Sequence, residues 1–432
     1  MNKIDINDHE ARLDLIKSRL RMRYAKERIF RFSGIAAILA ALSMLVMLFV
    51  TIIGNGYTAF QQTFIQLEIT FDREKIDPDG TEEIEMISGL DYGGIVKRTL
   101  SGMFPDVTDR KEKRDLYSLV SSGAAFQLSD MVTKDPGLIG TTQKIWVPAD
   151  DDVDMYMKGH ISAGEEGSGR FRDQKAKWID SLADKGLLRK RFNTALLTNG
   201  DSRDPELAGI WGAAVGSFYT MIVTLLLSFP LGVATAVYLE EFAPRNIWTD
   251  IIEVNINNLA AVPSIVFGLL GLAVFLNFFG LPRSAPLVGG LVLTLMTLPT
   301  IIIASRASLQ AVPPSIREGA LGVGASKMQS VTHHVLPLAL PGMLTGTIIG
   351  MARALGETAP LLMIGMVAFI VDIPAGIFDK ATVLPVQIYL WADSPERAFI
   401  ERTSAAIIVL LGFLLIMSAA AVVLRKKFEK RW

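Results

Sequence analysis

The sequence predicts a mainly α-helical membrane protein, with six transmembrane helices and a mixed α/β domain inserted between the first helix and the second. Three observations predict this fold class. Apolar residues make up 50% of the 432-residue chain, and its mean hydropathy is positive, at +0.36. Six apolar runs occur along the chain, and they are typical of membrane-spanning helices. Charged residues of both signs fill the long stretch between the first two runs.

The first apolar run covers residues 33–53. It follows a basic segment, residues 1–32, in which nine Lys or Arg stand against five acids. At about 1.5 Å of rise per residue, a run of this length just crosses a ~30 Å hydrocarbon core. A cleaved signal peptide has a shorter basic segment and an apolar run of only about 7–15 residues. We therefore interpret 33–53 as a retained transmembrane helix.

The stretch 54–208 is predicted to be a soluble domain, because it contains charge clusters and aromatic residues but no segment that could span a membrane. Residues 60–72 (FQQTFIQLEITFD) alternate apolar and polar side chains, which predicts a β-strand. Residues 175–185 have the pattern of a helix. A mixed α/β fold follows, and no chemistry is predicted for this domain.

The remaining part, 209–432, is predicted to be a membrane domain with five further spans. The apolar runs cover residues 213–239, 259–279, 286–304, 340–369 and 404–424. Six spans place both termini on one side, and the basic first segment and the basic tail at 425–431 (RKKFEKR) favour the cytoplasm by the positive-inside rule. The inserted domain then lies in the periplasm. The loop 240–258 is cytoplasmic in this topology, although it contains one Arg and four acids.

Composition excludes several classes of function. A net charge of −1 gives no general attraction to nucleic acid, and a chain without cysteine has no thiolate chemistry. The four histidines show no spacing typical of a zinc site, so no metal site is predicted. Residues 319–327 resemble a phosphate-binding P-loop only superficially, because Ala325 and Ser326 separate Gly324 from Lys327. No catalytic residue and no bound cofactor are predicted.

Two charged residues, Arg353 and Glu357, lie near the middle of the fifth apolar run. A charge at that depth costs about 2.5–3.5 kcal/mol on insertion scales, so such residues normally face protein or a water-filled path. At about 100° per residue, both lie within roughly 60° of Gly350. Gly350 forms a small-residue series with Gly342 and Gly346, which predicts a helix-packing face. We therefore expect the pair to face protein rather than lipid.

The chemistry of this pair fits an oxyanion substrate. An Arg guanidinium offers a planar fork of donors and stays charged at any pH, and Glu357 at i+4 can limit how tightly an anion binds. A purely structural salt bridge is the alternative, although a buried ion pair stabilises less than an apolar pair of similar size. Thr358 could donate a hydrogen bond to the anion, or to its own helix. The predicted substrate pathway therefore contains Arg353, Glu357 and Thr358.

The loop 305–337, predicted to form two short helices, carries the motif with the most specific spacing. It reads Glu318-Gly-Ala320, then Gly324, then His334-Val-Leu336-Pro337. This pattern resembles the "EAA" loop of ABC importer permeases, which docks on the ATPase subunit. The resemblance implies that Glu318, Gly319, Ala320 and Gly324 couple the chain to an ATPase. Gly319 replaces the usual Ala, and His334 replaces the usual aliphatic residue.

Residues 353–362 (RALGETAPLL) resemble the Pst-type permeases of ABC phosphate importers, and the ending APLL resembles their A-type subunit. Further matching segments are YLEEFAP (238–244), EVNINNL (253–259) and VPSIVFGLLG (262–271). The resemblance covers roughly 209–432 and not the inserted domain. It implies the bundle of a type I ABC importer permease and the role of a permease subunit in an ATP-driven phosphate importer of the bacterial inner membrane.

The same resemblance implies the partners. These are a C-type permease subunit, two ATPase subunits that bind ATP and Mg²⁺, and a periplasmic phosphate-binding protein. Two alternatives stay open: a permease for another oxyanion such as molybdate or sulfate, and a membrane-anchored sensor with a periplasmic domain. The RALGETAPLL segment favours phosphate, and the EAA-type loop favours transport.

Overall fold

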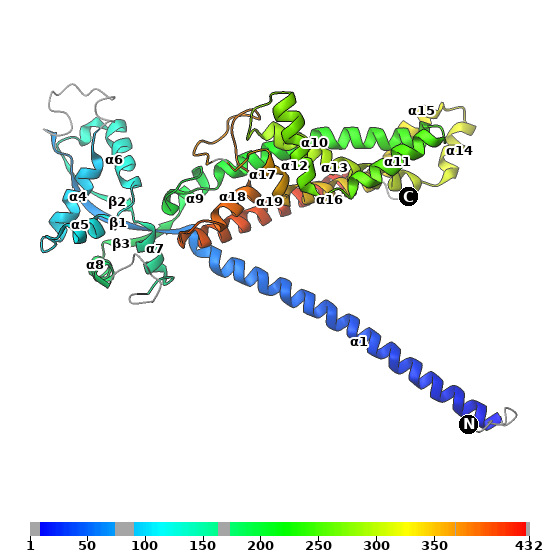
Figure 1. Ribbon diagram of the computed structural model, residues 1–432, viewed down its shortest axis with the longest axis horizontal. Coiled ribbons are helices and arrows are strands. Elements are labelled where there is room, and N and C mark those ends of the chain that lie inside the picture. The colour runs from blue at the N-terminus through cyan, green and yellow to red at the C-terminus, as the bar shows by residue number, and fades with distance from the viewer. Residues whose placement is uncertain (1–8, 74–89, 163–172, 368, 429–432) are drawn as a thin grey trace. The chain divides into compact units, whose positions relative to one another are not determined.

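The computed structural model of the protein describes residues 9–73, 90–162, 173–367 and 369–428 (Figure 1). The chain divides into two compact units, Met1–Gly54 and Asn55–Trp432. The first unit consists of the helix α1 (His9–Gly56), whose last two residues belong to the second unit. α1 contains the predicted span 33–53, and it is continuous with the basic residues that precede that span.

The inserted domain is built on a three-stranded antiparallel sheet in the order β2-β1-β3. The strands are β1 (Gln61–Thr70), β2 (Thr142–Pro148) and β3 (Leu188–Phe192). In the register, Leu67 pairs with Ile145 and Ile65 pairs with Leu188. Ile65, Leu67 and Ile69 are fully buried on one face, because successive side chains of a strand point to opposite faces. The strand predicted at 60–72 is therefore confirmed.

Helices pack on this sheet and complete the mixed α/β fold (Figure 1). They are α4 (Tyr92–Met103), α5 (Arg110–Tyr117), α6 (Gly123–Lys134), α7 (Asp151–Lys158) and α8 (Asp173–Asp184). The other elements of this stretch are α9 (Thr194–Thr198), which packs with residues of the membrane domain, and the 3₁₀ turns η1 (Tyr57–Phe60), η2 (Pro136–Leu138) and η3 (Pro205–Leu207). Leu100, Leu128 and Ile179 pack with β1 in the core of this domain. The helix predicted at 175–185 corresponds to α8.

Four long helices form the frame of the membrane domain. They are α10 (Trp211–Val237), α13 (Pro286–Gln310), α16 (Leu336–Gly356) and α19 (Ala398–Phe428). Among the residues that the structure describes, five helices, α1 included, are long and apolar enough to cross a membrane, or six if one bent pair counts as a single span. α13 packs against both α10 and α16. Shorter elements join these helices: the π-helical turns η4 (Tyr238–Phe242) and η6 (Val331–Val335), and the helices α14 (Pro314–Gly322), α15 (Lys327–Ser330) and α18 (Leu384–Ala392).

The third predicted span, 259–279, corresponds to a helical segment that begins only at Ser264, after a sharp bend. The structure contains α11 (Ile247–Ala260) and then α12 (Ser264–Gly271), which continues as the π-helical η5 (Leu272–Phe278), with a 102° bend between the two parts. Pro263 explains the bend, because proline lacks an N–H and disfavours helical geometry at the residue before it. Most of the predicted cytoplasmic loop 240–258 is therefore helical.

The fifth predicted span, 340–369, is also wrong in its bounds. The helix begins earlier, at Lys327 in α15, and ends at Gly356, and Glu357 has extended backbone with ψ 119°. A short helix, α17 (Ala359–Met363), follows. Pro360 accounts for the break, because its ring would clash with the carbonyl four residues earlier, at Gly356, and it has no N–H for that carbonyl.

Candidate functional site

Two glycines of the predicted series, Gly342 and Gly346, pack closely against α13, whereas a β-carbon on the third, Gly350, would make only ordinary contacts, the nearest at 3.8 Å from Ile301. A β-carbon built on Gly346 would lie 2.2 Å from Cβ of Ala304, and one on Gly342 would lie 2.3 Å from Oγ of Ser308. These distances are too short for any side chain, so only glycine allows the two helices to approach so closely. The position of α16 is therefore fixed by α13.

Arg353 and Glu357 lie at the end of α16, so the prediction that they sit near the middle of a transmembrane helix is wrong. Their expected direction, toward protein rather than lipid, stays a prediction. Arg353 is in the last turn and its side chain is 53% exposed, whereas the Glu357 side chain is 21% exposed. Arg353 shares its face with Ile349, which is 61% exposed. Because the helix ends at Gly356, helical periodicity no longer sets the direction of Glu357.

The pair is joined by one weak contact. Nε of Arg353 lies 3.5 Å from Oε1 of Glu357, at the limit of hydrogen-bond distance. Thr358 is the second residue of the break and precedes α17 as its N-cap, and its side chain makes no capping hydrogen bond. Behind the break, Gly268 of α12 approaches Pro360 so closely that a β-carbon there would lie 2.7 Å from Cα of Pro360. A helix break supported in this way is typical of membrane segments that line a cavity.

The EAA-type loop folds into α14 and α15, which confirms the first of the two predicted short helices; the second is wrong as a separate helix, because α15 continues through η6 into α16. Glu318 and Gly319 are exposed on α14, and Ala320 is buried at 7% exposure. Gly324 has a φ of +91°, a conformation that favours glycine, in the turn between the helices. The structure therefore separates these four residues into an outward-facing pair, one packing residue and one turn residue.

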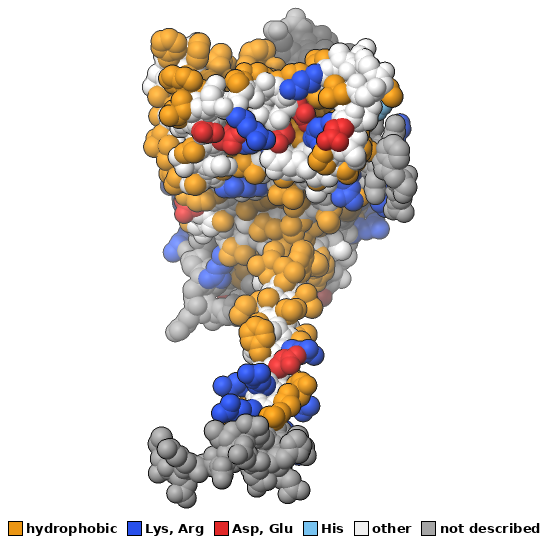
Figure 2. All heavy atoms as spheres, turned by 90° about the vertical axis from the view of Figure 1, so that its right-hand side faces the viewer, with side chains coloured by type: hydrophobic (Ala, Val, Ile, Leu, Met, Phe, Trp, Pro, Cys, Tyr) orange, Lys and Arg blue, Asp and Glu red, His pale blue; other side chains and the backbone are white. Residues whose placement is uncertain are grey.

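This loop is surrounded by ion pairs, and these ion pairs were not predicted from the sequence. Arg306 of α13 contacts Glu253 of α11 at 2.7 Å, and Arg317 of α14 contacts Glu241 of η4 at 2.7 Å. Figure 2 shows acidic and basic side chains gathered on this end of the membrane domain, among apolar ones. One sequence feature could have indicated these ion pairs, namely the excess of acids in the predicted loop 240–258. Those acids balance arginines of the neighbouring helices, which accounts for their presence on a side predicted to be basic.

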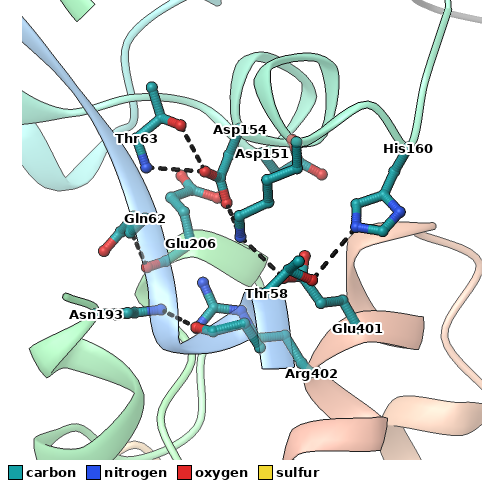
Figure 3. Close-up of polar contacts among 12 residues, drawn as sticks. Thr58, Gln62, Thr63, Asp151, Asp154, His160, Asn193, Glu206, Glu401 and Arg402 are labelled. Atoms are coloured by element: carbon teal, nitrogen blue, oxygen red, sulfur yellow. Dashed lines mark hydrogen bonds and ion pairs between the residues drawn. The ribbon is translucent and has the colours of Figure 1, made fainter. Parts of the chain in front are cut away.

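A second group of buried charges joins the inserted domain to α19 (Figure 3). Nζ of Lys158 lies 2.7 Å from Oδ2 of Asp154 and 2.9 Å from Oε1 of Glu401, and these three side chains are 3–6% exposed. Oδ1 of Asp154 accepts hydrogen bonds from N and Oγ1 of Thr63, both at 2.8 Å. We call Asp154, Lys158 and Glu401 the junction cluster. Sequence reasoning missed it, because its members are far apart along the chain.

Burial also perturbs carboxyl groups near the junction cluster. Burial raises the pKa of Glu206 to about 8, and Glu206 accepts a hydrogen bond from Oγ of Ser121. Burial, together with repulsion from Asp150 and Asp152, raises the pKa of Asp151 to about 7. Nζ of Lys175 lies 2.8 Å from Oδ2 of Asp152, so an ammonium group already balances this acidic turn.

Comparison with known proteins identifies the class of protein to which this chain belongs. Residues 228–431 match the family described as binding-protein-dependent transport system inner membrane component, and residues 17–166 match a domain of unknown function, DUF3333. The probable ABC transporter permease protein YqgH of Bacillus subtilis is 31% identical over 261 residues, which cover 58% of this chain and 83% of that protein. The chain belongs to the family of ABC transporter permeases, which are multi-pass proteins of the inner membrane and not enzymes themselves.

Within this family the chain is similar to permeases of the phosphate transport system. The phosphate transport system permease protein PstA 1 of Mycobacterium tuberculosis is 32% identical over 235 residues, covering 54% of this chain and 71% of that protein. Among solved structures, the MetNI methionine ABC transporter is 18% identical, with a TM-score of 0.39 over 51% of this chain and 95% of that chain.

Proposed function

We propose that this chain is the permease subunit of an ATP-driven phosphate importer and forms half of the translocation pathway. The observation that carries the proposal is Arg353, an exposed guanidinium beside a helix break in the segment RALGETAPLL. The similarity to phosphate transport permeases supports phosphate as the substrate.

The geometry of Arg353 suits a ligand that must bind and then leave. Only Nε contacts Glu357, and it does so at 3.5 Å, so the guanidinium keeps its terminal nitrogens for an oxyanion. The carboxylate of Glu357 repels that anion and lowers its affinity. A transport site needs this balance, because an anion held too tightly is not released. Thr358 adds a hydroxyl donor next to the pair.

The proposed complex contains the other components of such a system. A C-type permease covers the exposed face of α16 and completes the pathway, and a periplasmic phosphate-binding protein delivers the anion. Two ATPase subunits bind ATP and Mg²⁺ and contact the exposed Glu318 and Gly319 on α14. Both termini then lie in the cytoplasm and the inserted domain lies in the periplasm, and no nucleic acid takes part.

Anion competition tests the substrate. In cells that express the complete system, excess unlabelled phosphate should abolish uptake of labelled phosphate, whereas sulfate and molybdate at the same concentration should leave it unchanged. Inhibition by molybdate or sulfate as strong as that by phosphate would contradict the phosphate assignment.

Co-purification of the chain with an ATPase tests the transport role itself, since a membrane-anchored sensor would lack that partner.

A further inference from the structure

Arg317, the residue before the EAA-type glutamate, points its guanidinium away from the surface of α14 and into the membrane domain. Its Nε and Nη2 donate to Oε1 of Glu241, at 3.0 and 2.7 Å. Its Nη1 donates to the carbonyl of Val312 at 2.8 Å, and Nη2 also donates to the carbonyl of Leu309 at 2.9 Å. One side chain therefore joins α14 to η4, at the end of α10, and to the end of α13.

These contacts are strong for physical reasons. Leu309 lies in the last turn of α13, where the residue four positions on, Pro313, has no N–H to donate. Its carbonyl accepts from the N–H of Val312 at 3.2 Å, and Arg317 supplies a further, charged donor. Hydrogen bonds between ionised groups are shorter and stronger than neutral ones. The Glu241 side chain is 8% exposed and the Arg317 side chain 24%, so water and salt screen this pair less than a surface pair. The next two residues of α14, Glu318 and Gly319, are by contrast exposed.

The helices that Arg317 joins lead to the candidate pathway. α10 packs on α13 through Gly290, where a β-carbon would lie 2.5 Å from Val223. α13 packs on α16 through Gly346 and Ala304, and α16 carries Arg353 in its last turn. This series of close contacts connects α14 to Arg353, and closely packed helices have little free volume in which to absorb a displacement.

We propose that Arg317 is a positioning residue that transmits movement of α14 to α10 and α13, while Glu318 and Gly319 face the ATPase. This inference rests on the proposed function, because it requires an ATPase to move α14. In this proposal, Glu318 and Gly319 contact the ATPase, and Arg317 of the same helix contacts the membrane domain. Loss of Arg317 then separates the movement of α14 from the movement of the pathway, without preventing assembly.

Chemical labelling at the pathway end of α16 tests this directly. The chain has no cysteine, and a β-carbon on Gly356 meets nothing within 4 Å, so Gly356→Cys introduces one thiol near Arg353 without a clash. In the complete complex, binding of an ATP analogue should change the labelling rate of this thiol about fivefold or more, as measured by mass spectrometry of the labelled peptide. Adding Arg317→Gln should remove most of that change while the ATPase still co-purifies.

Two further variants make the test specific. Glu241→Gln removes the acidic partner but leaves the carbonyl contacts of Arg317, and it should reduce the ATP response in the same direction. Arg306→Gln is the matched control, because it removes an ion pair of the same length between α13 and α11, together with a 3.5 Å contact between α13 and Glu240 of η4, without touching α14. It should keep the ATP response.

The outcomes separate this inference from the proposed function. A full ATP response in Arg317→Gln, or an equal loss in Arg306→Gln, would overturn the role of Arg317. No ATP response in the parent complex would overturn it as well, since there would be no movement to transmit. Neither readout depends on the transported anion. A complex that responds to ATP but does not carry phosphate would contradict only the substrate assignment.

Discussion

Arg353 and Arg317 carry the same chemical group in two different settings. The Arg353 side chain is 53% exposed and has one contact with Glu357 at 3.5 Å, so it is available to a ligand. Arg317 makes four hydrogen bonds to Glu241 and two backbone carbonyls, so its donors are committed to the fold. The same residue type therefore serves binding in one place and transmission in the other.

Glu206 gives a residue-scale prediction of pH dependence. Burial raises its pKa from 4.5 to about 8. Between these two values the folded chain keeps a proton that the unfolded chain has released, so stability falls as pH rises through this window. Glu206→Gln cannot ionise and should be more stable than the parent at about pH 9, by an amount on the order of a few kcal/mol.

Thermal unfolding of the purified chain across this window measures the effect. The parent and Glu206→Gln should unfold at similar temperatures at the acid end of this pH window, where Glu206 is protonated in both the folded and the unfolded chain. Their unfolding temperatures should diverge as pH rises. Parallel pH profiles would show that Glu206 ionises normally in the folded chain.

At the scale of elements, the packing of α16 on α13 gives a prediction with a matched control. Gly346→Ala would place a methyl 2.2 Å from Cβ of Ala304, whereas Gly356→Ala meets nothing within 4 Å on the same helix. We expect Gly346→Ala to destabilise the membrane domain by about 1–3 kcal/mol through overpacking, and Gly356→Ala to change it by no more than about 0.5 kcal/mol. Denaturant titration in detergent would measure both, and equal effects would contradict the close approach.

The sequence predicted the elements better than their ends. The apolar runs located α1, α10, α13 and α19, because burial in lipid requires long uncharged stretches. The break after Gly356 was missed, since a run of apolar residues continues past it and only Pro360 indicates the end of the helix. The 102° bend before α12 likewise occurs at a proline, Pro263.

The candidate site was predicted in part. RALGETAPLL located Arg353, Glu357 and Thr358, and the EAA-type spacing located α14. The exposure of Arg353 could not be predicted, because it depends on where α16 ends. The contacts of Arg317 and the junction cluster were also missed, since their partners lie far away in sequence and only folding brings them together.

At the scale of the whole molecule, the junction cluster determines how the inserted domain is held to α19. Lys158→Met should cost about 3–5 kcal/mol, because it removes the ammonium group that pairs directly with the buried Asp154 and Glu401 and leaves only the neighbouring Arg402 to balance them. The matched control is Lys134→Met, which removes an exposed i,i+4 pair with Asp130 and should cost no more than about 0.5 kcal/mol. Limited proteolysis of the inserted domain would measure the difference. Equal proteolysis rates would show that other contacts hold the domain.

The central claim is that this chain passes phosphate through a pathway that contains Arg353, driven by ATP bound to other subunits. The most direct measurement is phosphate accumulation in proteoliposomes that contain the complete complex and the phosphate-binding protein. We predict accumulation that requires ATP, and its loss in Arg353→Gln although that variant inserts and assembles normally. Unchanged accumulation in Arg353→Gln, or no ATP-dependent accumulation by the parent complex, would contradict the account.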